Sequence, residues 1–259
     1  MSTILFNQIV FGPVKSRRLG VSLGINLLPV DGKLCSFDCI YCECGLNAQG
    51  KGNGIIPSRE EVKSALEKKL MEMKSEHAPL DVITFAGNGE PTLHSDFSAV
   101  IDDTIELRDK YFPETKISVL SNASMIHKPE VFQALLKIDN NILKLDSIKD
   151  EYVYNVDRPQ NTAFTVGKLI ENLKKFEGRL IIQTMFIKGM YNSINVDNTS
   201  DEHIAEFIDA LRKINPQLIM IYTIARETPV KGIEKVSEEE LNRIAEKIRE
   251  AGVKVSVSA

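Results

Sequence analysis

The chain contains no tryptophan, no long apolar run and only four cysteines in 259 residues. The missing tryptophan excludes nothing, but no apolar stretch approaches the roughly 20 residues that a membrane-spanning helix needs. The N-terminus also lacks the charged start and the long apolar core of a signal peptide. These absences predict a cytoplasmic protein without a membrane span, in a reducing setting where disulfides are rare.

The charge balance gives no global reason to expect a nucleic acid as the partner, because the formal net charge is −4. A local basic surface would nevertheless suffice for such binding. The hydrophobic content of 43% is ordinary for a globular protein, and the length fits one large domain or two small ones. Since no shift in composition marks a linker, we expect a single domain over residues 1–259. It would have an N-terminal cover and basic turn at 1–20 and a candidate edge strand at 252–259.

Strand and helix patterns alternate along the whole chain. Apolar runs predict strands at 21–28, 80–86, 116–121, 142–146, 180–187, 218–223 and 253–257. Helical patterns lie between them, starting at Ser58 and then covering 96–110, 129–138, 164–176, 201–214 and 237–251. Ser58 with Glu61, and Ser237 with Glu240, have the spacing of capping boxes. Such alternation requires parallel strands with right-handed crossovers, so the fold class is α/β, although periodicity alone does not separate an open sheet from a barrel.

Three of the four cysteines, Cys35, Cys39 and Cys42, lie within eight positions in a segment rich in loop-forming residues. Clustered thiols in a reduced protein indicate a metal or redox centre. A tetrahedral zinc site would need further ligands, and no histidine lies nearby to complete it. Three thiolates on one tight loop suit a cubane iron–sulfur cluster in which one iron has no protein ligand.

The C-x3-C-x2-C spacing, with an aromatic residue before the last cysteine, resembles the cluster loop of the radical S-adenosylmethionine (SAM) superfamily. The resemblance implies that Cys35, Cys39 and Cys42 hold one 4Fe-4S cluster, that SAM chelates the open iron, and that Tyr41 lies against the adenine. It implies reductive cleavage of SAM to methionine and a 5′-deoxyadenosyl radical, which abstracts hydrogen from a substrate. It also implies a partial (β/α)6 TIM-like barrel and a low-potential electron donor such as flavodoxin or ferredoxin.

A second motif, Gly87-Asn88-Gly89-Glu90-Pro91, follows the predicted strand at 80–86. Glycines let the backbone approach a ligand closely, and a carboxylate can accept a hydrogen bond from an ammonium group. The motif resembles the G-G-E-P sequence that holds the methionyl amino group of SAM in this superfamily, with Asn88 in place of the second glycine. A turn with a solvated glutamate is the alternative. The resemblance makes Gly87, Asn88, Gly89 and Glu90 candidate SAM-binding residues.

Further polar residues fall on or just after later strands, where ligands gather in parallel α/β folds. Asn122 is a candidate for a SAM hydroxyl or carboxylate, or a cap for the next segment. Lys144 and Asp146 share one face of their strand and are candidates for the SAM carboxylate and ribose, or a structural ion pair. Gln183 would point inward as a weaker candidate. Tyr222 would flank the adenine or simply pack.

The likeness extends to a subgroup of small iron–sulfur oxidoreductases that are labelled as related to wyosine (tRNA) synthetases. The residues that carry it are Phe11 to Gly20, Phe85 to His94, and Asp157-Arg158-Pro159. The label suggests tRNA as the substrate, and the compact size with few cysteines suggests a partner protein that carries a glycyl radical. His94 is the one histidine close in sequence to the second motif.

Four residues are weaker substrate candidates. Arg17 and Arg18 form a basic pair that is either a solvated turn or a contact for RNA. Arg158 can fork onto a carboxylate or phosphate, or tie its own loop. Cys44 is a bystander thiol, a group that resolves a substrate radical, or a ligand of a second centre. In a rival, non-catalytic zinc or iron–sulfur binding module, Cys44 would be the fourth ligand.

Overall fold

The computed structural model describes residues 4–16, 19–48, 50 and 52–259, and it is built around one curled sheet. The sheet order is β1-β2-β3-β4-β5-β6-β9-β11. Six parallel strands form its centre: Gly20–Ile25 (β2), Val82–Phe85 (β3), Lys116–Ser121 (β4), Asn140–Lys144 (β5), Ile181–Met185 (β6) and Leu218–Tyr222 (β9). Val255–Ser258 (β11) adds a parallel edge, and Val10–Ser16 (β1) adds an antiparallel one. In the described part of the chain β1 and β11 do not pair, so the barrel is partial, as predicted.

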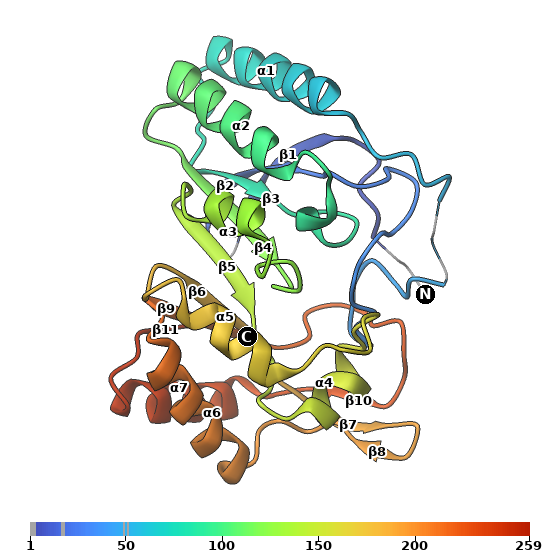
Figure 1. The fold of residues 1–259 in the computed structure, drawn as a ribbon, viewed down its shortest axis with the longest axis vertical. Helices are drawn as coiled ribbons and strands as arrows, with labels where there is room; N and C mark the ends of the chain where they lie inside the picture. The colour runs from blue at the N-terminus through green and yellow to red at the C-terminus, as the bar shows by residue number, and fades with distance from the viewer. Residues whose placement is uncertain (1–3, 17–18, 49, 51) are drawn as a thin grey trace.

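The helices cover the outer face of this sheet (Figure 1). They are Arg59–Ser75 (α1), Phe97–Tyr111 (α2), Pro129–Leu135 (α3), Val166–Lys174 (α5), Asp201–Ile214 (α6) and Glu238–Glu250 (α7). The main core lies between these helices and the outward side chains of the strands, such as Phe85, Val119 and Ile219. Burying one apolar face of every helix against one sheet is the arrangement that the alternating pattern predicts.

The concave face of the sheet carries smaller and more polar side chains. The hydroxyls of Ser22 on β2 and Thr84 on β3 lie 2.8 Å apart and are both buried. On the strands β5, β6 and β9, Ile142, Ile181 and Met220 form a separate apolar cluster. The strands therefore contribute both polar and apolar side chains besides the main core.

Several elements differ from the expectation. The segment expected to be a turn at 12–20 continues as β1 up to Ser16, because it pairs with β2. The register shifts between Phe11 and Val14, which accommodates Pro13, a residue that cannot donate to the ladder. Asp150–Val156 (α4) is a helix that the sequence patterns do not predict. Ile187–Tyr191 (β7), Ile194–Asn195 (β8) and Ile233–Lys235 (β10) form a small antiparallel sheet that the sequence patterns do not predict.

The two predicted capping boxes have different outcomes. At α1, the Ser58 side chain accepts from the Glu61 backbone, and the Glu61 side chain accepts from the Ser58 backbone, so the box is complete. At α7, Ser237 accepts from the Glu240 backbone, but the Glu240 carboxylate lies 2.7 Å from the Lys188 ammonium instead. A tertiary ion pair thus replaces half of the second box.

His203, near the start of α6, is expected to make stability fall in acid. Burial, together with the charge of Lys149, lowers its pKa to about 4. The pKa of His203 is lower in the folded protein than in the unfolded chain, where it is near 6.5. Below pH 6.5 the unfolded chain therefore binds a proton that the folded protein does not, and the free energy of unfolding decreases as the pH falls toward 4. Between pH 7 and pH 4, His203 should therefore contribute a loss of about 3 kcal/mol to the free energy of unfolding, measured by denaturant unfolding as the difference between the wild type and a variant without this histidine. The His203→Leu variant should lack this loss, and equal pH slopes in the two proteins would contradict the assignment.

Candidate functional site

The loop that carries Cys35, Cys39 and Cys42 follows β2 and is pinned to the end of α4. The backbone N–H of Asp38 donates to the carbonyl of Asp157 at 3.0 Å, and that of Ile40 donates to Val156 at 2.9 Å. Within the loop, the Cys42 N–H donates to the Cys39 carbonyl at 3.1 Å. The loop is thus held by a segment more than a hundred residues later in the chain, at the carboxyl ends of the strands.

The four thiols have unequal environments. Burial raises the pKa of Cys35 to about 12 and raises that of Cys39 as well. The Cys44 thiol donates a hydrogen bond to Cys42, which lowers the pKa of Cys42 to about 6, and the Lys33 ammonium adds to this effect. The same bond raises the pKa of Cys44. Cys42 is therefore the thiol that most readily becomes a thiolate.

The donor set fits an iron–sulfur cluster by its chemistry. Three soft thiols come from one loop, and their charges act on one another and on the buried Lys33. Among the residues that the structure describes, no three His, Cys, Asp or Glu side chains form a group that would hold a single metal ion. The fit rests on the identity of the donors and on the cation beside them.

The Gly87–Glu90 turn and the cysteine loop are joined through their backbones. The Leu34 N–H donates to the Asn88 carbonyl at 2.9 Å, and the Glu90 N–H donates to the Leu34 carbonyl at 3.1 Å. Gly89 has a φ of +138°, and a Cβ atom there would lie 1.8 Å from the Leu34 carbonyl oxygen. Any other residue would force the two segments apart, so Gly89 is required for their contact.

Glu90 links the end of β3 to the end of β4. Its carboxylate is buried and accepts from the Thr92 N–H at 3.1 Å, from the Ser121 hydroxyl at 2.8 Å and from the Asn122 N–H at 2.6 Å. The Thr92 hydroxyl is a fourth donor, at 2.5 Å. Burial raises the pKa of Glu90, while these hydrogen bonds oppose the rise. One of its oxygens, Oε2, has a single partner among these and retains capacity for a ligand.

Asn88, which departs from the G-G-E-P pattern, points away from the cysteine loop and holds the N-terminal segment. Its Oδ1 accepts from the Phe6 N–H at 2.8 Å, and its Nδ2 donates to the Phe6 carbonyl at 2.9 Å. Nδ2 also donates to the Pro29 carbonyl at 2.8 Å, and the side chain is fully buried. The amide thus connects the motif to residues 6–11, where the ring of Phe6 stacks on that of Phe11.

Replacing Asn88 by glycine, which restores the G-G-E-P sequence, is expected to free the N-terminal segment without unfolding the barrel. The variant loses three side-chain hydrogen bonds, each worth about 1 kcal/mol net. Hydrogen exchange of the amides at 6–11 should become at least tenfold faster, while exchange in β4 and β5 stays unchanged. Unchanged exchange at 6–11 would show that Asn88 does not hold the segment.

Tyr41, Lys144 and Asp146 come together in one buried network. The Tyr41 hydroxyl hydrogen-bonds both Lys144 and Asp146, and the Lys144 ammonium lies 2.7 Å from Asp146 and 3.5 Å from Asp157. Burial raises the pKa of Asp157 to about 7. Asp157 also lies 3.5 Å from the Cys39 sulfur. Lys144 and Asp146 therefore form an ion pair beside the cysteine loop, which was one of the two alternatives, and Asp157 joins them unpredicted.

The remaining SAM candidates lie around this network. The Asn122 side chain donates to the Ser36 hydroxyl at 2.9 Å and lies 3.6 Å from the Cys35 sulfur. Gln183 pairs in register with Lys144 on the neighbouring strand. Tyr222 ends β9 and packs against the apolar cluster that contains Tyr41. Their roles toward SAM stay predictions.

The substrate candidates are less concentrated. The Arg158 guanidinium lies 3.5 Å from the Asp38 carboxylate, so it ties its loop to the cysteine loop. Cys44 contacts Cys42 and lies 3.5 Å from the Gly87 carbonyl. Arg17 and Arg18 lie outside the described residues.

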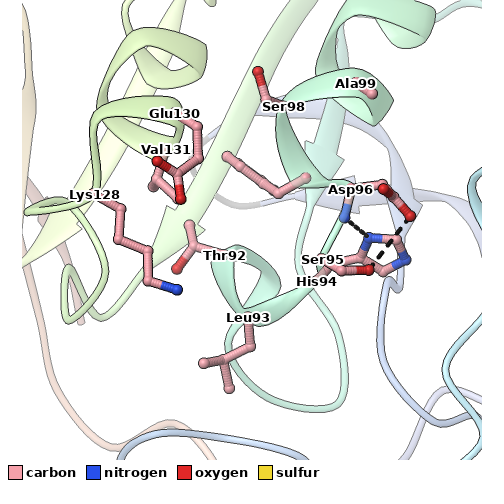
Figure 2. A pocket seen from close by; sticks show the side chains of 11 residues that line it. Thr92, Leu93, His94, Ser95, Asp96, Ser98, Ala99, Lys128, Glu130 and Val131 are labelled. Carbon is pink, nitrogen blue, oxygen red and sulfur yellow. Dashed lines mark hydrogen bonds between the residues drawn. The ribbon is translucent and has the colours of Figure 1, made fainter.

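His94 has a structural setting, shown in Figure 2. Its Nδ1 accepts from the Asp96 N–H at 3.1 Å, so Nε2 carries the proton and donates to the Pro57 carbonyl at 2.8 Å. A cavity of about 240 Å³ lies beside it, lined by Thr92 and the start of α2 on one side and by Lys128 and Glu130 on the other. Both ring nitrogens therefore make hydrogen bonds that hold the segment leading into α2 in place.

Residues 30–211 match the family described as the radical SAM superfamily, a span that contains the cysteine loop, the Glu90 turn and the Lys144 network. The chain belongs to the radical SAM superfamily. The resemblance stated from the cysteine spacing is therefore confirmed, and with it the prediction of a SAM-dependent enzyme. A relative, the UPF0026 protein of Helicobacter pylori strain J99, is 33% identical over 237 residues, covering 90% of this chain and 71% of that protein.

Radical SAM enzymes of known structure share the fold. A methyltransferase from Sphaerobacter thermophilus has a TM-score of 0.69 at 16% identity, over 92% of this chain and 65% of that one. SuiB of Streptococcus suis bound to SAM has a TM-score of 0.63 at 18% identity, and this chain covers 49% of its length, with 88% of this chain aligned. TYW1 with a lysine–pyruvate adduct has a TM-score of 0.60 at 14% identity, over 88% of this chain and 73% of that one. At these identities the structures support the predicted partial barrel.

Three charged residues of the site were missed by the sequence analysis, namely Lys33, Asp38 and Asp157. Asp38 lies between two of the cysteines, Lys33 lies two residues before Cys35, and Asp157 is next to Arg158, so proximity to residues already singled out was the available signal. In the residues that the structure covers, no helix has the length and apolar character to cross a bilayer.

Proposed function

We propose that this radical SAM enzyme binds a 4Fe-4S cluster through Cys35, Cys39 and Cys42 and binds SAM against the turn that ends in Glu90. When bound, the cluster supplies the electron that cleaves SAM and so begins hydrogen abstraction from the substrate. The observation that carries the proposal is the backbone pairing of Leu34 with the Gly87–Glu90 turn, which keeps the thiols and the carboxylate in one unit.

The protein contributes positioning and exclusion of water. Oε2 of Glu90 would accept a hydrogen bond from the amino group of SAM. Tyr41, held by Lys144 and Asp146, would present a fixed ring to the adenine. Because Lys144 is already paired with Asp146 and Asp157, it would add little net charge to the SAM site.

A cavity of about 600 Å³ inside the curled sheet would receive the substrate group. Its walls include the stacked rings of Phe6 and Phe11, and Met220 lines it from β9. Lys15, which is exposed, brings positive charge to the lining, whereas Arg226 is paired with Glu43, another lining residue. Such a cavity suits a compact, partly apolar group, with Lys15 placed to contact an anionic part of its carrier.

Anaerobic reconstitution followed by strong reduction tests the chemistry. We expect about four irons per chain and 5′-deoxyadenosine that forms only when reductant and SAM are both present. Reduced flavodoxin or ferredoxin should replace the chemical reductant. Iron binding without SAM cleavage would contradict the proposal.

For the substrate, we propose an RNA group, as the resemblance to the wyosine-related subgroup suggests. Lys15 and the Arg17–Arg18 pair would contact phosphates, so tRNA binding should weaken with salt. The Arg17→Ala/Arg18→Ala double variant should bind tRNA more weakly and with a shallower salt dependence. Salt-independent binding, or a glycyl radical seen by EPR on a partner protein, would favour activation of a glycyl-radical enzyme instead.

A further inference from the structure

Lys33 is a buried cation beside the cysteine loop. Its side chain is 1% exposed, and its ammonium donates to the Gly45 carbonyl at 2.7 Å. It also hydrogen-bonds the sulfur of Cys42, and its positive charge interacts with the thiol of Cys35. An ammonium removed from water in this way is strongly unfavourable unless negative charge compensates it.

Carboxylates alone supply too little negative charge around Lys33, so the thiolate side of the cysteine loop must provide the rest. The nearest carboxylate is that of Asp38, whose Oδ1 lies 3.6 Å from the ammonium and accepts from the Asn47 N–H at 2.6 Å. The other oxygen of Asp38 faces the Arg158 guanidinium at 3.5 Å. Two cations therefore share one carboxylate, and the group of three carries a net positive charge.

Lys144, the other lysine whose charge acts on these thiols, is in the opposite situation. Its ammonium lies 2.7 Å from Asp146 and 3.5 Å from Asp157, so two carboxylates surround one cation. That network is compensated without any ligand. The unmatched positive charge thus lies on the Lys33 side of the cysteine loop.

We propose that Lys33 is the resident counter-charge of the iron–sulfur cluster and makes its one-electron reduction more favourable. This inference rests on the proposed function, since it requires a cluster on Cys35, Cys39 and Cys42. An oxidised 4Fe-4S core with three thiolates carries a single net negative charge, and reduction adds a second. A fixed cation in a site poor in water stabilises the more negative state, because the attraction is weakly screened there.

The test is an EPR-monitored redox titration of the reconstituted protein and three variants. Lys33→Met removes the charge, Lys33→Arg keeps it, and Lys174→Met removes a charge from an exposed i,i+3 pair on α5. We expect reduction of Lys33→Met to be at least tenfold less favourable, which corresponds to a potential 59 mV more negative for one electron. Lys33→Arg should recover most of this shift, and Lys174→Met should match the wild type.

Each outcome separates this role from a purely structural one. A Lys33→Met protein with full iron content and a wild-type potential overturns the proposal. If Lys33→Met does not retain iron, retention by Lys33→Arg supports a requirement for charge, and failure of both variants overturns it in favour of packing. A wild type that binds no cluster contradicts the proposed function itself, whereas a wild type that cleaves SAM with an unshifted Lys33→Met contradicts this inference alone.

Discussion

The Cys39→Ala variant is expected to retain almost no iron after anaerobic reconstitution, whereas the wild type should retain about four irons per chain. Cys39 is the buried thiol of the three, and its removal leaves two candidate ligands on the loop. Formation of 5′-deoxyadenosine should fall at least a hundredfold, to the background of the reductant alone. Iron analysis and chromatography of the SAM products measure the two effects on the same sample.

Cys44→Ala is the matched control, because it removes a thiol that lies next to Cys42 and outside the proposed ligand set. This variant should keep its iron and its SAM cleavage. The zinc-module alternative gives the opposite pattern, since it requires Cys44 as a fourth ligand. If the Cys44→Ala variant loses bound zinc and the wild type does not cleave SAM, the proposed cluster binding and SAM cleavage are refuted.

Replacing Glu90 by alanine is expected to lower the unfolding free energy by about 3–5 kcal/mol. Its carboxylate is buried and satisfies four donors, which belong to Thr92, Ser121 and Asn122. Alanine leaves these donors without an acceptor in a site closed to water. Glu90→Gln should cost about 1–3 kcal/mol, because its carbonyl can replace Oε1 but its amide group opposes the Asn122 N–H.

Denaturant unfolding of the apoprotein measures this effect without interference from a cluster. Ser121→Ala is a useful comparison, since it removes one of the four donors and should cost less than either Glu90 variant. After reconstitution of the cluster, both Glu90 variants should also lose SAM cleavage. Full stability in Glu90→Ala would contradict the bridging role that the hydrogen bonds indicate.

The sequence predicted the parallel strands and the strand-end location of most site residues, because both depend on local patterns. Strands such as Leu218–Tyr222 are continuous apolar runs, and the polar residues Glu90, Asn122 and Lys144 end or follow other strands of the sheet. The carboxyl ends of parallel strands meet at one edge, so the chemistry of the separate motifs could be combined before any contact was known.

What the sequence could not predict depends on pairing between distant segments. The strand Val10–Ser16 contains glycine and proline and forms because β2 offers it a partner. The partner of Asn88 is the backbone of Phe6, and no local pattern encodes that contact. Likewise, the uncompensated charge of Lys33 is visible only once Asp38 and Arg158 are found together.

The position of the first residues has a practical consequence for anyone who purifies this protein. Ile4 and Phe6 line the cavity within the sheet, and the Ile4 N–H donates to the carbonyl of Glu43, next to Cys42 and Cys44. A fusion that displaces Ile4 and Phe6 would therefore remove part of the chamber wall. A fusion after Ala259 follows β11, at the opposite edge of the sheet from β1, and does not involve these two residues.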